Sequence, residues 1–79
     1  MVRVLYFASC REQAGLAAED LPVGGQTVAQ VVAAIALRHP SLAALLPRCR
    51  VAVNQSFAND ADLVPEGAEL ALVPPVAGG

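Results

Sequence analysis

The last two residues of the sequence, Gly78 and Gly79, are the part of this chain best suited to chemistry. A terminal Gly-Gly has no side chain to shield its carboxylate or to block its entry into a narrow cleft. The carboxyl end is therefore a candidate reactive group. The alternative is that small residues gather at a terminus because a frayed end tolerates them, and the dipeptide alone does not decide between the two.

The residues before the glycines predict an extended stalk. Pro74 and Pro75 stop a strand, because proline donates no hydrogen bond to a β-ladder. They favour a polyproline conformation of about 3.1 Å per residue, so residues 74–79 can hold the carboxylate up to roughly 20 Å from the domain. We therefore expect a folded domain over residues 1–73 and a flexible, extended C-terminal tail over residues 74–79.

A free carboxylate must be activated before a nucleophile can attack it, for example by AMP supplied from ATP. The sequence contains neither a Walker loop nor a G-x-G-x-x-G motif. We therefore expect this chain to bind no cofactor and a partner enzyme to use the ATP. Once activated, the acyl group could be attacked by an amine, a thiol or sulfide. Attack by sulfide or persulfide would leave a thiocarboxylate, which is a nucleophile at neutral pH.

Composition excludes several classes of protein. The chain has 79 residues, of which 56% are hydrophobic and 15% charged, so it is too apolar to be disordered and apolar enough to suggest a partner surface. Its net charge is −2, and five scattered arginines with no lysine make no basic stripe for nucleic acid. No apolar run approaches the length of a membrane span and no signal peptide is visible, so we expect a cytoplasmic protein.

Few side chains suggest metal or redox chemistry. Cys10 and Cys49 are too few and too far apart in sequence for a zinc site or a C-x-x-C pair, so we expect two reduced, apolar residues. A reactive thiol at Cys10 is the open alternative. His39 lies on an apolar helical stripe and is expected to pack at a helix end rather than to catalyse. The acidic residues show no metal-ligand spacing, and no metal site is predicted.

Hydrophobic patterning predicts the fold. Alternation indicates strands over residues 2–8, 18–23, 48–53 and 68–73, with a short strand near Phe57. A helix is expected over residues 28–39, with a capping box at Thr27 and Gln30. Residues 9–15 are expected to form a break with a single turn that begins at Ser9, and residues 41–46 a short helical turn. This order predicts an α+β β-grasp, or ubiquitin-like, fold with a mixed sheet of about five strands and one main helix packed on one face.

Several segments of the chain occur in the order of a known family, namely residues 4–8, 11–12, 15, 52–55 and 73–79. Together they resemble the small subunit of molybdopterin synthase, a ubiquitin-like sulfur carrier. The closing Pro-Pro-Val-Ala-Gly-Gly is the most specific part of the resemblance, whereas residues 16–46 match in pattern only. The resemblance therefore runs from the first strand to the last residue.

The resemblance implies a division of labour in molybdenum cofactor biosynthesis. An E1-like adenylating enzyme would activate Gly79, and a sulfur donor protein would supply the sulfur for a thiocarboxylate. The tail would then enter the large subunit of molybdopterin synthase and give sulfur to cyclic pyranopterin monophosphate, within a heterotetramer of two carriers and a large-subunit dimer. The chain itself would be a non-catalytic carrier subunit.

A partner surface is expected beside the tail. Leu5 and Phe7 alternate away from the face of the first strand that the helix covers, and Ala71 and Val73 do the same on the last strand. They would form an apolar docking patch unless loops cover it. Arg11, followed by Glu12, is either a partner contact or half of a local charge pair. The full set of predicted partner-binding residues is Leu5, Phe7, Arg11, Val73, Pro74, Pro75, Val76 and Ala77.

Three other functions remain open. The first is a carrier of the same fold for thiamine thiazole or cysteine synthesis, against which the long segment 9–15 and the Pro-Pro before the tail weigh. The second is a ubiquitin-like modifier that is conjugated to lysines of other proteins. The third is a plain interaction domain with an incidental tail, for which loss of Gly79 would change nothing.

Overall fold

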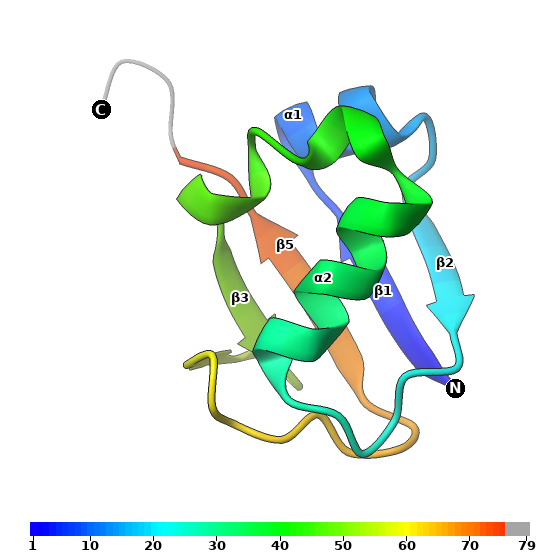
Figure 1. Ribbon diagram of the computed structural model, residues 1–79, viewed down its shortest axis with the longest axis vertical. Coiled ribbons are helices and arrows are strands. Elements are labelled where there is room, and N and C mark those ends of the chain that lie inside the picture. Colours follow the sequence, from blue (N-terminus) through cyan, green and yellow to red (C-terminus); the bar gives the residue numbers. More distant parts are fainter. Residues whose placement is uncertain (76–79) are drawn as a thin grey trace.

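The computed structural model describes residues 1–75 of the chain (Figure 1). The predictions made for Val76, Ala77, Gly78 and Gly79 therefore fall outside the described residues. Within the described part, the elements follow one another in the order β, α, β, α, two short 3-10 turns and three further strands.

A five-stranded mixed sheet forms one layer of the domain. The strands are β1 (Val2–Tyr6), β2 (Ala18–Leu21), β3 (Arg50–Val53), β4 (Ser56–Ala58) and β5 (Glu69–Val73), and they lie side by side in the order β2-β1-β5-β3-β4. The two central strands, β1 and β5, run parallel, whereas the other neighbours are antiparallel. This arrangement confirms the predicted β-grasp sheet.

The main helix, α2 (Val28–Arg38), crosses one face of the sheet (Figure 1). Its start is the predicted capping box: the Gln30 amide donates to the Thr27 hydroxyl at 3.2 Å, and the Thr27 amide donates to the Gln30 side chain at 2.9 Å. The helix ends one residue earlier than expected, because His39 has left the helical conformation ahead of Pro40.

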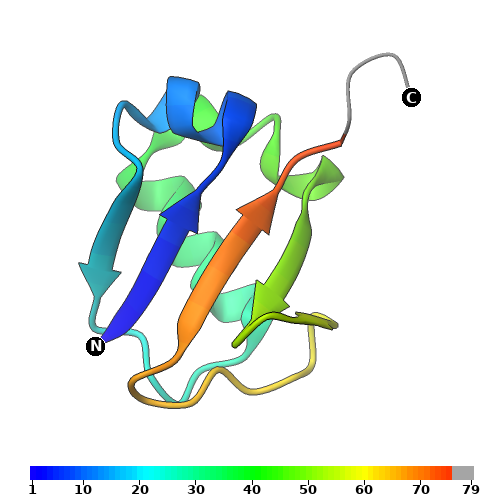
Figure 2. The same ribbon diagram turned by 180° about the vertical axis from the view of Figure 1, so that it is seen from behind.

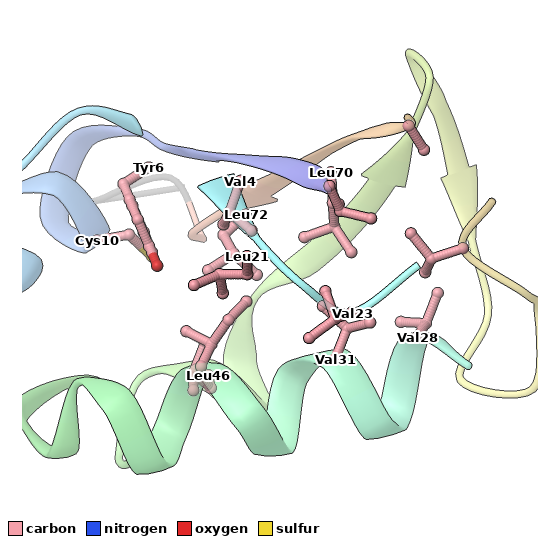
Figure 3. Close-up of a cluster of buried hydrophobic side chains, with 14 of the residues drawn as sticks. Val4, Tyr6, Cys10, Leu21, Val23, Val28, Val31, Leu46, Leu70 and Leu72 are labelled. Atoms are coloured by element: carbon pink, nitrogen blue, oxygen red, sulfur yellow. The ribbon is translucent and has the colours of Figure 1, made fainter. Parts of the chain in front are cut away.

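The hydrophobic core fills the space between α2 and the sheet (Figure 3). Every second residue of the central strands points into it, as the two-residue period of a strand requires. The largest fully buried side chains are Tyr6, Ile35, Leu42, Leu70, Leu72, Val2, Val4, Val28, Val31, Val64 and Cys10. The apolar stripe of α2 and the alternation of β1 and β5 thus meet as the sequence predicts.

The segment after β1 differs from the prediction. Residues 8–14 form a seven-residue helix, α1 (Ala8–Ala14), rather than a single turn that begins at Ser9. The chain leaves β1 after Tyr6, and the Cys10 amide donates to the Phe7 carbonyl at 2.9 Å. The helix buries Cys10 in the core, which favours helix over a longer strand. Gly15 ends α1 in the left-handed conformation, with a φ of 79°, which glycine adopts readily.

Other boundaries also differ: β3 begins at Arg50 rather than at residue 48, and β5 begins at Glu69 rather than at residue 68. β2 ends at Leu21 rather than at residue 23, because Pro22 has no amide hydrogen for a ladder. The expected turn over residues 41–46 is two 3-10 turns, η1 (Pro40–Leu42) and η2 (Leu46–Arg48), which bury Leu42 and Leu46. Among the helices of residues 1–75, none is long and apolar enough to cross a bilayer.

Candidate functional site

The face of the sheet opposite α2 carries no helix within the described residues (Figure 2). The strand register sets Leu5 beside Ala71, Ala71 beside Ala52, and Ala52 beside Phe57. Leu5, Ala71 and Ala52 are partly buried, and Phe57 is 58% exposed. We call these four residues the apolar row. It confirms that apolar side chains of β1 and β5 line an uncovered face, and it extends that face to β3 and β4.

The end of this face nearest the tail is also apolar, with one cation. Phe7, which follows β1, is 47% exposed, and Val73, the last residue of β5, is partly buried and pairs with Arg50 of β3. The Arg50 guanidinium lies 3.6 Å from the centroid of the Phe57 ring, a cation–π contact. Sequence reasoning missed Arg50 as a site residue, although its place on the solvent-facing side of a strand was visible.

The opposite end of the same face is charged. The guanidinium of Arg3 donates to both carboxylate oxygens of Asp20, at 3.0 and 3.1 Å. This hydrogen bond lowers the pKa of Asp20 and raises that of Arg3. Glu69 is the pairing partner of Arg3 on β5. The open face is therefore divided, with charged side chains at one end and apolar side chains at the end where the chain leaves β5.

The two prolines at the start of the tail differ in their exposure to solvent. Pro74 is buried whereas Pro75 is exposed, so Pro74 packs with the domain although it was predicted as the first residue of the stalk. The buried Pro74 fixes the direction in which the chain leaves the sheet. The predicted reactive residues Gly78 and Gly79, with Val76 and Ala77, lie outside the described residues.

Arg11 and Glu12 are both exposed on α1. Among residues 1–75, no ion pair joins Arg11 to Glu12 or to any other carboxylate. The local charge pair that was one of the two interpretations is therefore not formed there. Arg11 lies one helical turn after Phe7, whose carbonyl accepts a hydrogen bond from the Arg11 amide at 3.3 Å.

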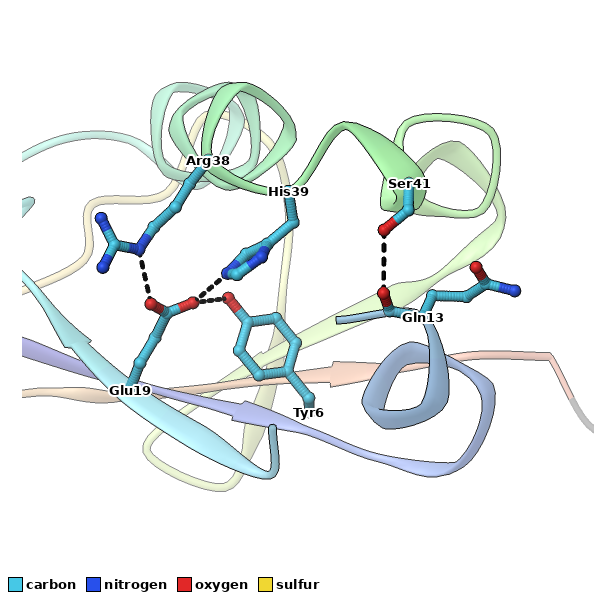
Figure 4. A network of polar contacts seen from close by, with 6 residues as sticks. All are labelled: Tyr6, Gln13, Glu19, Arg38, His39 and Ser41. Atoms are coloured by element: carbon cyan, nitrogen blue, oxygen red, sulfur yellow. Dashed lines mark hydrogen bonds and ion pairs between the residues drawn. The ribbon is translucent and has the colours of Figure 1, made fainter. Parts of the chain in front are cut away.

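A polar cluster joins β1, β2 and the end of α2 on the covered side of the sheet (Figure 4). Its centre is Glu19, whose side chain is 10% exposed. One carboxylate oxygen accepts from the Tyr6 hydroxyl at 2.5 Å and lies 2.5 Å from Nε2 of His39, and the other accepts from Nε of Arg38 at 2.6 Å. The Tyr6 and His39 rings meet edge to face, with centroids 5.6 Å apart.

The pKa values in this cluster follow from its contacts. Burial alone would raise the pKa of Glu19, but hydrogen bonds from Tyr6, His39 and Arg38 lower it below its ordinary value. Burial, followed by the hydrogen bond to Glu19, raises the pKa of Tyr6. Among residues 1–75, no buried side-chain nitrogen or oxygen atom lacks a hydrogen-bond partner, and neither of the two surface grooves lined by Cys49 includes a residue of this cluster. The cluster therefore fastens the fold, and His39 is the helix-end packing residue that the sequence predicts.

Metal ligands are not gathered in the described part of the chain. Residues 1–75 contain no group of three or more His, Cys, Asp or Glu side chains placed to hold an ion. The two cysteines, in contrast, are neighbours: the sulfur atoms of Cys10 and Cys49 are 3.4 Å apart. We expected two reduced, apolar residues, and both are free thiols. Their proximity was not visible in the sequence, because α1 and the turn before β3 bring them together.

Comparison with known proteins agrees with this geometry. Residues 4–79 match the ThiS family. A molybdopterin synthase sulfur carrier subunit of Chlamydomonas reinhardtii is 35% identical over 99% of this chain and 98% of its own length. The crystal structure of SAMP1 from Haloferax volcanii superposes with a TM-score of 0.82 at 30% identity, covering 99% of this chain and 98% of that chain.

A second solved structure is described as a putative molybdopterin converting factor, subunit 1, from Pyrococcus furiosus. It has a TM-score of 0.82 and 27% identity, and it covers 95% of this chain and 97% of that one. The resemblance to molybdopterin synthase small subunits that the sequence indicated is thereby confirmed. The match reaches from β1 to the last glycine, and the chain belongs to the ThiS family, among relatives that are sulfur carrier subunits of molybdopterin synthase.

Proposed function

We propose that this chain carries sulfur for molybdopterin synthase on the carboxylate of Gly79. The observation that supports this most strongly is the match over nearly the whole length of both chains to a sulfur carrier subunit of that enzyme. The family match also extends through Gly79 itself. A β-grasp domain with an apolar face beside its last strand suits a carrier that must dock on successive partners.

The proposed reaction begins at the terminal carboxylate. An E1-like adenylating enzyme joins a carboxylate oxygen of Gly79 to the AMP moiety of ATP, and pyrophosphate leaves. A persulfide sulfur of the donor protein then attacks the glycyl carbonyl and AMP leaves. A second thiolate of the donor cleaves the resulting acyl disulfide, which leaves a thiocarboxylate on Gly79 and a disulfide on the donor, so that one carboxylate oxygen is exchanged for sulfur. The thiocarboxylate enters the large subunit of molybdopterin synthase, where its sulfur passes to cyclic pyranopterin monophosphate.

This chain contributes position and recognition to the proposed cycle. Leu5, Phe7 and Val73 would rest against the large subunit, with Arg11 beside them. The exposed Pro75 begins the part of the tail that enters the partner, followed by Val76 and Ala77. Glycine at the last two positions allows the backbone to thread where a Cβ would clash. The charged end of the open face lies away from this contact.

The experiment that tests this proposal is an intact mass measurement. The chain is incubated with ATP, a sulfur donor and its adenylating enzyme, and one exchange of oxygen for sulfur at the C-terminus is expected. A variant that lacks Gly79 is the control and should remain unchanged. An exchange that survives the loss of Gly79, or no exchange in the intact chain, would contradict the proposal.

A second candidate function is attachment to other proteins. The structural similarity to SAMP1 supports it, since another solved structure describes that Haloferax volcanii protein as small archaeal modifier protein 1. Both functions would use the same activation of Gly79. A modifier would be found as an amide between Gly79 and a lysine of another protein, whereas a carrier would be found as a thiocarboxylate. Because the chain has no lysine, it could not accept a second copy on a side-chain amine.

A carrier for thiamine thiazole or cysteine synthesis differs from our proposal in the molecule that accepts the sulfur. Under that alternative, the thiocarboxylated chain would transfer its sulfur without the large subunit of molybdopterin synthase.

The cytoplasmic location that the sequence predicts stays a prediction.

A further inference from the structure

Two thiols from distant parts of the chain meet under the root of the tail. Cys10 and Cys49 are 39 positions apart in sequence, and their sulfur atoms are 3.4 Å apart. A disulfide needs about 2.05 Å between the two sulfur atoms, so a small approach would bring the pair to bonding distance. Both residues are free thiols in this structure.

Rigid elements hold the two thiols in place. Cys10 belongs to α1, which is fastened to η1 by a 2.8 Å hydrogen bond from the Ser41 hydroxyl to the Gln13 carbonyl. Cys49 directly follows η2 and precedes β3. Its sulfur lies 3.4 Å from the carbonyl oxygen of Leu45, to which its S–H donates. These hydrogen bonds hold α1 and the turn before β3 in the positions that bring the two thiols close together.

We propose that Cys10 and Cys49 form a redox site that closes to an intramolecular disulfide when it meets a thiol-disulfide oxidant, such as oxidised glutathione. This inference is independent of the sulfur-carrier function, because it rests on the two side chains and not on Gly79.

Access to the site is one-sided. Cys10 is completely buried, whereas Cys49 is partly exposed and lines two open grooves on the surface. One groove is also lined by Arg50, Phe57 and Asp60. Burial, followed by the hydrogen bond to Cys49, raises the pKa of Cys10 to about 12. Cys49 is therefore the thiol that meets an external disulfide, and Cys10 is the resolving thiol behind it.

The closure proceeds in two thiol–disulfide exchanges. The Cys49 thiolate attacks one sulfur of oxidised glutathione, forms a mixed disulfide and releases one glutathione thiolate. The Cys10 thiolate then attacks the Cys49 sulfur, which forms the internal disulfide and releases the second glutathione. The two thiol protons pass to the two released glutathiones, and the two electrons that the cysteines lose reduce the oxidant.

The bridge would tie together the elements on either side of β5. α1 continues from β1, Cys49 precedes β3, and β5 lies between these two strands. The residues that carry the tail root, Val73 and the buried Pro74, leave the sheet at this end. Oxidation would therefore lock the domain beneath the tail without using any residue of the tail.

The test uses the full chain, exposed to oxidised glutathione and then to an alkylating reagent under native conditions. We expect a monomer that has lost two hydrogen atoms, has no alkylated cysteine, and gains both alkyl groups once it is reduced and alkylated in denaturant. The thermal midpoint of the oxidised form should rise by roughly 10 °C. A stable glutathione adduct on Cys49 with Cys10 still a thiol, a disulfide-linked dimer, or no reaction at all would overturn the proposal.

Two single variants test the order of events. Cys10→Ala removes the resolving thiol, so the reaction should stop at one glutathione on Cys49. Cys49→Ser removes the accessible thiol. Because Cys49 is partly exposed, this replacement disturbs the fold less than a replacement of the buried Cys10. In the folded variant, Cys10 should resist glutathione until the chain unfolds. Rapid modification of Cys10 in folded Cys49→Ser would contradict the one-sided access.

Discussion

Leu5 of β1 and Ala71 of β5 are direct partners in the one parallel strand pair of the sheet, and both face away from α2. This pairing places the centre of the apolar row on the two strands that lead to Phe7 and to the tail root. When a partner covers an apolar side chain that is exposed to water on this face, the burial of apolar surface stabilises the complex. The pairing thus relates the fold directly to the proposed docking of the large subunit.

Replacing Phe7 with Asn should weaken binding of the large subunit at least tenfold and leave the fold intact. Phe7 is the N-cap residue of α1 and makes no side-chain capping bond, whereas Asn is a favoured N-cap. The variant therefore loses an exposed aromatic contact but gains a helix cap. Calorimetric titration of the purified large subunit measures the affinity, and thermal unfolding checks the fold.

The matched control for this variant is Leu37→Gln. Leu37 is 84% exposed on α2, on the other side of the molecule, so its replacement should leave the affinity unchanged. If the Phe7→Asn variant and the unmodified chain bind the large subunit with equal affinity, Phe7 does not belong to the partner surface.

Replacing Glu19 with Gln should lower the free energy of unfolding by about 2 kcal/mol at neutral pH. The carboxylate accepts hydrogen bonds from Tyr6 and Arg38 and contacts His39, and an amide cannot accept from all of them. Urea unfolding followed by circular dichroism measures the difference. A loss below a few tenths of a kcal/mol would show that the cluster contributes little to stability.

The same variant should reveal a pH dependence. The folded state lowers the pKa of Glu19 below its ordinary value of 4.5, so the unfolded chain takes up the proton first. The stability from Glu19 is therefore complete above about pH 4.5 and is lost as the pH falls through the lowered pKa. Unfolding of both proteins at stepped pH values should show their difference shrink in that acidic window. A difference in stability that grows on acidification would mean that folding raises the pKa of Glu19, which would contradict this prediction.

Replacing Gln55 with Gly should stabilise the domain by about 0.5–1 kcal/mol. Asn54 and Gln55 connect β3 to β4 with φ values of 49° and 70°, and Asn-Gly is the preferred pair for such a turn. The Asn54→Gly variant is the control: it relieves the same kind of strain but loses the 3.0 Å hydrogen bond that the Glu69 amide donates to the Asn54 side chain. The urea midpoint should rise for Gln55→Gly and rise less, or fall, for Asn54→Gly.

Local signals predict much of this fold. The capping box at Thr27, the stripe through Val31 and Ile35, and the two-residue alternation of β1 are all determined by neighbours in sequence. The helix α1 was missed because its N-cap, Phe7, has no capping side chain, and because the burial of Cys10 that favours it depends on tertiary packing. Sequence patterns report local preferences better than long-range packing.

The candidate sites also differ in whether local sequence or long-range packing determines them. The proposed reactive end could be inferred from the sequence, because the proposed chemistry belongs to the terminal carboxylate of Gly79 and not to side chains that the fold brings together. The contacts of Glu19 with His39 and of Cys10 with Cys49 join residues 20 and 39 positions apart. No spacing rule reveals such pairs, because they depend on the packing of α2, α1 and the turns against the sheet.

The most direct test of sulfur carriage is a single turnover in the reconstituted complex. The thiocarboxylated chain is mixed with the large subunit of molybdopterin synthase and cyclic pyranopterin monophosphate, and the carrier and the pterin are both analysed by mass spectrometry. Our account predicts that the carrier returns to a carboxylate as the pterin gains sulfur. A carrier that keeps its sulfur, or that loses it by hydrolysis with no sulfur in the pterin, would contradict the account.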